Sequence, residues 1–121
     1  MNVSTTRPIP ALTAAGFQVL LAVASGHTHG YAVMRFVEEL TGGRVRLGPG
    51  TLYRTIARLL ADDVVTDSET HDPSAPHDAR RRYYQLTALG EQAVREEAEQ
   101  LARMVDAART AGLLDPQRRT A

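Results

Sequence analysis

The residues best suited to chemistry in this chain lie between positions 51 and 58, where arginine and threonine recur at helical spacing. Four of them fall at i, i+3, i+4 and i+7, on one face of a helix: Thr51, Arg54, Thr55 and Arg58. Guanidinium groups bind phosphates and guanine edges, and hydroxyl groups donate to phosphates, so this face suits DNA. A solvated helix face is the alternative. We call this face the arginine stripe. Next to it in the sequence, we expect the Tyr53 ring to pack on the core and its hydroxyl to reach a phosphate.

Three consecutive arginines, Arg80, Arg81 and Arg82, form a second basic group. They begin a run typical of a β-strand, where alternation sends Arg80 and Arg82 to one side and Arg81 to the other. We expect at least one of them to contact a backbone phosphate, and a solubilising charge run is the alternative. Residues 62–79 carry six acidic residues and no basic one, so we expect the tip of this segment to point away from DNA or to be disordered.

Other reactive residue types show no pattern of a catalytic or metal site. The chain has four histidines, none at the spacing of metal ligands on a helix: His27, His29, His71 and His77. It has no cysteine, which excludes disulfides and thiolate chemistry. Neither a Ser, His and Asp arrangement in a catalytic motif nor a phosphate-binding glycine loop is present in the sequence. We therefore expect no enzyme activity, no metal and no cofactor.

Length and composition indicate one globular domain. The chain has 121 residues, of which 43% are hydrophobic and 23% charged, and its 14 basic residues, all arginine, balance 14 acidic ones. The charge is uneven, because residues 1–61 carry six arginines and only two glutamates. No apolar run approaches the roughly 18 residues of a membrane span, and the N-terminus does not resemble a secretion signal, so we expect a cytoplasmic protein with no membrane partner.

Three short helices must position the arginine stripe. The first is expected from Leu12 to Ser25, the second from Tyr31 to Leu40 and the third from Pro49 or Thr51 to Ala61. Thr13 can cap the first helix, and the glycines at 26, 42 and 43 can end the first two. Helical spacing and apolar character assign these side chains to the core: Phe17, Leu20, Leu21, Ala24, Tyr31, Val33, Phe36, Val37, Leu40, Leu52, Ile56, Leu59 and Leu60.

A hairpin and a long helix follow. The β-prone runs 64–66 and 82–87 predict two strands joined by a long polar tip. From Ala88, capped by Thr87, an uninterrupted helical pattern runs to about Ala111, a length of roughly 36 Å. Its apolar positions step by 4, 3, 4 and 3 residues, which is a heptad-like seam that predicts a second chain: Val94, Ala98, Leu101, Val105 and Ala108.

Four short motifs, in this order, give the chain a resemblance to a known family. They are His29-Gly30-Tyr31, Gly50-Thr51-Leu52-Tyr53, Arg58-Leu59 and the stretch Tyr84-Gln85-Leu86-Thr87-Ala88-Leu89-Gly90. Over residues 12–112 the chain resembles the PadR family of bacterial transcriptional regulators. It departs from the family pattern at three positions, with Arg54 in place of Pro, Leu60 in place of Glu and Asp63 in place of Gly. Asp can adopt the left-handed conformation that Gly would take, so we expect the turn to survive.

The order of elements and the resemblance together imply a mainly α fold with a small β-hairpin. This is a winged helix-turn-helix domain followed by a C-terminal dimerisation helix. The expected parts are a flexible arm at 1–10, a DNA-binding domain at 11–87 with a mobile wing tip at 68–79, a dimerisation helix at 88–112 and a frayed tail at 113–121.

The implied function is sequence-specific binding to double-stranded DNA, as a homodimer on a near-palindromic operator, with repression of transcription. The alternative is an effector-sensing or protein-interaction dimer with little DNA affinity, which the net charge of zero and the acidic wing tip favour. A small-molecule effector of unknown identity is left open. Some relatives bind flat aromatic compounds at the dimer interface by stacking on Trp, and this chain has no Trp to support that mode.

Overall fold

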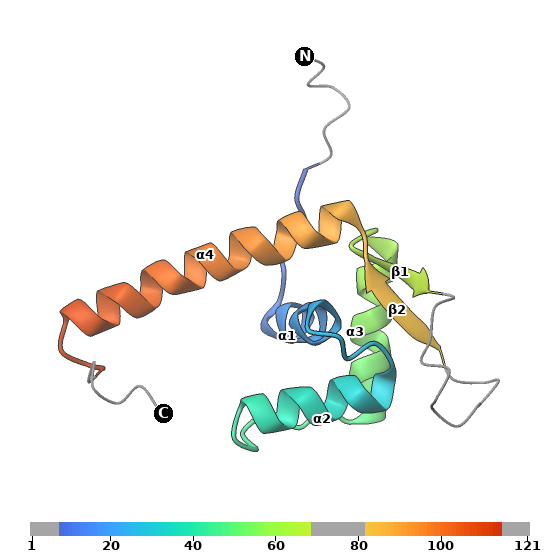
Figure 1. The fold of residues 1–121 in the computed structure, drawn as a ribbon, viewed down its shortest axis with the longest axis horizontal. Helices are drawn as coiled ribbons and strands as arrows, with labels where there is room; N and C mark the ends of the chain where they lie inside the picture. The colour runs from blue at the N-terminus through green and yellow to red at the C-terminus, as the bar shows by residue number, and fades with distance from the viewer. Residues whose placement is uncertain (1–7, 69–81, 115–121) are drawn as a thin grey trace, which may run out of the picture.

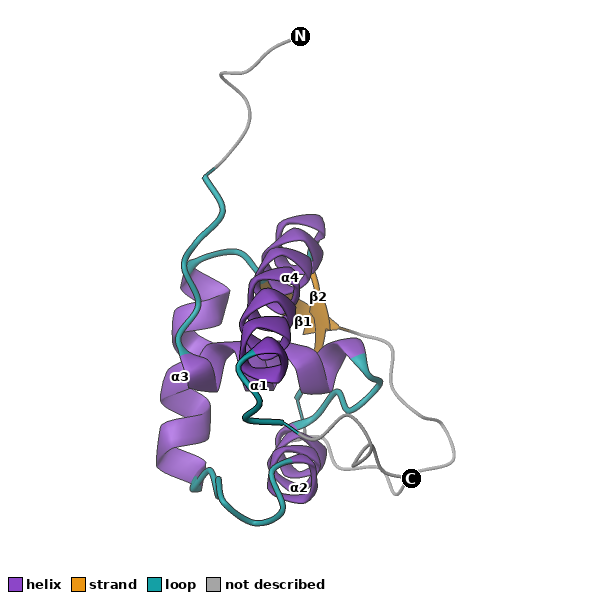
Figure 2. Ribbon diagram, turned by 90° about the vertical axis from the view of Figure 1, so that its left-hand side faces the viewer, coloured by secondary structure: helices purple, strands orange, loops and turns teal. Residues whose placement is uncertain are grey.

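Four helices and one two-stranded hairpin make up the part of the chain that the computed structural model describes, residues 8–68 and 82–114. The order is α1 (Ala14–Ala24), α2 (Gly30–Leu40), α3 (Pro49–Ala61), β1 (Val65–Ser68), β2 (Tyr83–Leu86) and α4 (Ala88–Thr110). Helix α1 lies in the centre with α4 above it, α2 below it and the hairpin to its right (Figure 1), and α3 stands to one side of it, across its direction (Figure 2). This arrangement is a winged helix, as the sequence predicts.

Helix α1 contacts α2, α3, α4 and β2, and it forms the middle of the core. Thr13 caps it as predicted, because the Gly16 N–H donates to Thr13 Oγ1 at 2.9 Å. The predicted buried face is wrong except for Leu20. Phe17 and Leu21 are half-buried and Ala24 is exposed, while the buried residues are Gly16, Val19, Leu20, Ala22 and Val23. Because nearly every residue of α1 is apolar, its spacing does not single out one face.

Helix α2 begins one residue earlier than predicted, with His29 as its N-cap. The Ala32 N–H donates to His29 Nδ1 at 3.3 Å. Val33 and Val37 are buried as predicted, and Phe36 is half-buried. Two core assignments are wrong, because Leu40 ends the helix on its exposed side and Tyr31 is 60% exposed.

Gly30 is the reason that Tyr31 faces outward. Gly30 itself is buried against α3, and a Cβ there would collide with the hydroxyl end of Tyr53 and lie 3.3 Å from Leu52 Cδ2. The first turn of α2 therefore presents its glycine to α3, and the next residue points away from the core.

Helix α3 starts with Pro49 in its first turn, and Leu52, Ile56 and Leu59 are buried as predicted, with Leu60 half-buried. The turn after α3 has Asp63 at a φ of 62°, which confirms that Asp takes the left-handed position. In the antiparallel hairpin, Val65 lies opposite Leu86 and Asp67 opposite Tyr84. Ser68, assigned to the wing tip, belongs to β1; the rest of the tip lies outside the described residues.

Thr87 joins the hairpin to α4. It caps α4 as predicted, since the Gly90 N–H donates to Thr87 Oγ1 at 2.9 Å, and the same hydroxyl donates to the Asp63 carbonyl at 2.6 Å. Ala93 is buried and Leu89 and Val94 pack against the core, so the N-terminal half of α4 belongs to the domain. The C-terminal half extends away from it (Figure 1). None of the described helices is long and apolar enough to cross a membrane.

Candidate nucleic-acid interface

The predicted arginine stripe lies on one face of α3, and that face is open to solvent. Thr51, Arg54 and Arg58 are exposed and Thr55 is half-buried. The Arg54 guanidinium donates to Thr51 Oγ1 at 3.3 Å and forms no ion pair with any described residue. The Arg58 side chain is 77% exposed, and its Nε lies 3.4 Å from Asp62. Sequence reasoning did not include Asp62 in the site, although it lies four residues beyond Arg58 and so on the same face.

Tyr53 does not lie as predicted. The residue is 51% exposed, and the hydroxyl end of its ring lies against Gly30. The ring therefore spans the contact between α3 and α2 at the surface instead of packing into the core. The absence of a side chain at Gly30 makes room for it, and the residue pattern of α3 alone gave no signal of this contact.

A groove runs beside the stripe, between α3 and the segment that leads into α1. It has a volume of about 220 Å³. Its lining includes the side chains of the stripe on one wall and the start of α1 on the other: Ala11, Leu12, Thr13, Gly16, Arg54, Thr55, Arg58, Leu59 and Asp62. The outer face of α3 thus has two flanks, with Tyr53 toward α2 and Arg58 toward this groove.

On the β1–β2 hairpin, which is the wing of the fold, Arg82 forms an ion pair with Asp67. One guanidinium nitrogen donates to both carboxylate oxygens, at 2.7 and 2.8 Å, and the guanidinium carbon lies 5.9 Å from the centroid of the Tyr84 ring. The hydrogen bond from Arg82 to Asp67 raises the pKa of Arg82, and burial raises the pKa of Tyr84, so Arg82 stays charged and Tyr84 neutral. Arg80 and Arg81 lie outside the described residues.

Two further arginines precede α3. Arg44 and Arg46 are exposed in the link between α2 and α3, and Arg46 Nε lies 3.4 Å from Glu38. Sequence reasoning counted these charges but did not assign them to the site. Their position in the turn of a helix-turn-helix was the signal that could have found them.

The predicted seam of α4 is exposed over most of its length. Ala98, Leu101 and Val105 are exposed, while Val94 packs against the core and Ala108 is half-buried. Met104 is also exposed on this half of the helix. The sequence analysis missed it because it lies one position off the heptad-like spacing.

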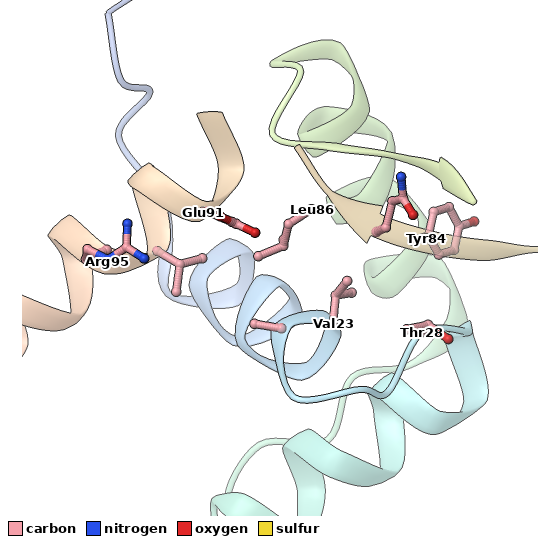
Figure 3. Close-up of a pocket in the computed structure, with 9 residues that line it drawn as sticks. Val23, Thr28, Tyr84, Leu86, Glu91 and Arg95 are labelled. Carbon is pink, nitrogen blue, oxygen red and sulfur yellow. The ribbon is translucent and has the colours of Figure 1, made fainter. Parts of the chain in front are cut away.

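A second cavity, which the sequence did not predict, lies where α1, β2 and α4 meet (Figure 3). Its volume is about 720 Å³, and it is largely open to solvent. Glu91 and Arg95 reach it from α4, and Tyr84 and Thr28 lie at its other end. Apolar side chains, among them Val23, Leu86 and Val94, line the space between. Within residues 8–68 and 82–114, no group of three or more His, Cys, Asp or Glu side chains could hold a metal ion.

Comparisons with known proteins agree with this architecture. Bordetella bronchiseptica BpsR, whose DNA binding is regulated by 6-hydroxynicotinic acid, shares 28% sequence identity, with 95% of this chain and 76% of that chain covered and a TM-score of 0.65. A transcriptional regulator from Clostridium thermocellum, at 19% identity, shares the fold with a TM-score of 0.63 and coverage of 79% and 87%.

A curated relative is closer in sequence. An uncharacterised 37.1 kDa protein in transposon TN4556 of Streptomyces fradiae is 38% identical over 86 residues. The match covers 71% of this chain and 22% of that protein, so this chain spans less than a quarter of the relative's length. The family model described as "Transcriptional regulator PadR-like family" matches residues 19–96, more than half of the chain. With the winged-helix order and the motifs in place, the chain belongs to the PadR-like family of transcriptional regulators.

Proposed function

We propose that the chain is a sequence-specific DNA-binding regulator that acts as a homodimer and represses transcription from a near-palindromic operator. The observation that carries this proposal is the solvent-open face of α3 with Arg54 and Arg58, on the helix that enters the major groove in winged-helix proteins. Bound at a promoter, such a dimer blocks transcription, which is why repression is the expected direction.

The proposed contacts follow from position. Arg54 lies on the exposed face of α3 and meets a guanine edge or a phosphate, with Thr51 and Thr55 as hydroxyl donors. Arg58 reaches a phosphate after exchanging Asp62 for it, because an exposed ion pair stabilises little. Tyr53 stays a proposed backbone contact, and so do Arg80, Arg81 and Arg82 of the wing.

The homodimer is supported by apolar surface that one chain leaves uncovered. On α4 the exposed seam residues Leu101 and Val105 are joined by Met104. On α1, Phe17 and Leu21 are only half-buried although the helix is central. A second copy that lays its α4 along this surface buries both sets, with Ala98 and Ala108 permitting close approach and Val94 at the end of the seam. The two α3 helices would then face major grooves about one turn, roughly 34 Å, apart.

The test is a mobility-shift titration of the purified chain on the DNA upstream of its own gene, at several salt concentrations. We expect a steep negative dependence of log affinity on log salt. Arg54→Ala and Arg58→Ala should each flatten the slope by about 1.8 if the side chain contacts a phosphate, because a dimer loses one such contact on each of its two chains. Arg109→Ala, on the far end of α4, is the control and should bind like the wild type. No retention of DNA at low salt would contradict the proposal.

The cavity between α1, β2 and α4 favours a second candidate, the effector-sensing dimer with little DNA affinity. Its size suits a small organic ligand, and Arg95 offers a positive charge at one end. 6-Hydroxynicotinic acid, which regulates BpsR, is a reasonable first probe. A rise in the thermal midpoint with this compound, lost in Arg95→Ala, together with no DNA binding at low salt, would favour this candidate.

A further inference from the structure

A second exposed surface adjoins the recognition helix on the flank that faces α2. We call it the Tyr31 patch, and it consists of Tyr31, Arg35 and Tyr53. The hydroxyl end of Tyr53 lies against Gly30, and Tyr31 is the next residue of the chain. Arg35, one turn further along α2, has its guanidinium carbon 5.9 Å from the centroid of the Tyr31 ring. Tyr31 and Arg35 therefore lie on α2 beside the point where Tyr53 of α3 meets that helix.

The two residues of the patch on α2, Tyr31 and Arg35, contribute little to stability. Tyr31 is 60% exposed, so its ring contributes little to the core, and Tyr53 is 51% exposed. Arg35 pairs with Glu39 at 3.0 Å, but both side chains are well exposed and lie four residues apart on one helix. Such pairs contribute little to folding and exchange readily for another anion. The chain thus places two phenol groups and an exchangeable arginine on a solvent-facing surface.

The position of the patch suits contact with one of the two phosphate backbones that flank the DNA major groove. A helix with its side chains is about 10–12 Å across and nearly fills a groove about 12 Å wide, so side chains on its two flanks face the two phosphate backbones. On α3, Tyr53 lies on one side of Arg54 and Arg58 on the other. Arg58 lies beside the protein groove next to α1, and the Tyr31 patch lies toward α2. With α3 in a major groove, Arg58 would face one backbone and the Tyr31 patch the other.

We propose that Tyr31 and Arg35 bind the DNA backbone on this flank, with the Tyr31 hydroxyl donating to a phosphate oxygen and Arg35 exchanging Glu39 for a phosphate. The proposal rests on the proposed function and adds contacts that fix the register of α3 in the groove without reading sequence. It also gives a role to the tyrosine of the His29-Gly30-Tyr31 motif, which the sequence analysis placed in the core.

The test uses the full chain and two fluorescent duplexes, one from its own upstream region and one of unrelated sequence, titrated at several salt concentrations. Tyr31→Phe keeps the ring and removes the hydroxyl. We expect it to weaken binding about 3- to 10-fold on both duplexes without changing the salt slope, because a neutral donor displaces no counterion. Arg35→Gln should flatten the slope by about 1.8, one phosphate contact on each chain of the dimer, and Arg35→Lys should restore it.

Arg109→Gln is the matched control, since Arg109 also pairs with an acid on its own helix, Asp106, and lies far from α3. The inference is overturned if Tyr31→Phe and Arg35→Gln bind both duplexes like the wild type, or if their loss is confined to the upstream duplex, which would mean base readout. Failure of the wild-type chain to bind either duplex is a different result, and it would overturn the proposed function itself.

Discussion

Arg58 and Arg82 share a feature that limits how strongly this surface attracts DNA: each carries a carboxylate partner on the same face. Arg58 pairs with Asp62, and Arg82 with Asp67. Phosphates must replace these carboxylates and approach two negative charges as they do so, whereas Arg54 has no acidic partner among the described residues. We infer that the acids lower non-specific affinity, so that binding depends more on the contacts of Arg54.

Removing the charge of Asp67 should therefore strengthen DNA binding. In Asp67→Asn, Arg82 loses its ion pair and a repulsive charge disappears from the wing, so we expect affinity to rise about 3- to 10-fold on operator and unrelated DNA alike. Fluorescence anisotropy at moderate salt measures the change. Asp106→Asn, which removes a similar exposed partner from Arg109, serves as the control and should leave affinity unchanged. Equal or weaker binding by Asp67→Asn would show that Arg82 does not meet DNA.

At the scale of elements, the approach of α2 to α3 depends on Gly30. A Cβ at this position has no space, because the hydroxyl end of Tyr53 already fills it. The clashing atoms are the end of a half-exposed side chain that can move aside, so Gly30→Ala should lower the free energy of unfolding by no more than about 1 kcal/mol. Thermal unfolding monitored by circular dichroism measures it. In the background of Tyr53→Phe, which removes the clashing oxygen, the same substitution should cost clearly less, and an equal cost in both backgrounds would refute this contact.

The joint between the wing and α4 depends on Thr87. Its hydroxyl both caps α4 and donates to the Asp63 carbonyl, so Thr87→Ala should lower the free energy of unfolding by about 1–2 kcal/mol. Chemical denaturation measures this value. Thr110→Ala, at the exposed last residue of α4, should change the stability much less. Comparable losses in the two variants would mean that the joint contributes nothing.

The features that the sequence predicted well are local ones. Thr13 and Thr87 cap their helices and Asp63 takes the left-handed position because each depends on a few neighbouring residues. Tyr31 and Ala24 were misplaced because their exposure depends on which elements pack beside them, and periodicity does not contain that information. The partner of Arg82 could not be predicted, since it requires the register that sets Asp67 opposite Tyr84.

For the whole molecule, the long reach of α4 beyond its own domain is the feature that points to assembly. The half of α4 that extends outward carries Leu101, Met104 and Val105 on its surface. In a monomer these apolar side chains would stay exposed to solvent. Tight DNA binding therefore requires two chains, because each supplies one α3 helix and the affinities of linked half-sites multiply.

Leu101→Asp should give monomers and abolish tight binding. A charge in the centre of the seam cannot be buried against a second copy without a large desolvation cost, so association fails. Sedimentation velocity gives the mass, and a mobility shift gives the affinity. Gln100→Asp, on the neighbouring position outside the seam, should stay dimeric. A dimeric Leu101→Asp variant would show that the chains associate elsewhere.

Hydroxyl-radical footprinting of the purified chain on the DNA upstream of its gene tests whether two copies of α3 bind neighbouring major grooves. We expect two protected segments with near-palindromic sequence, their centres about one helical turn apart, and loss of both in the Arg54→Ala, Arg58→Ala double variant. Absence of protection at low salt, or a footprint that the double variant leaves intact, would contradict this arrangement.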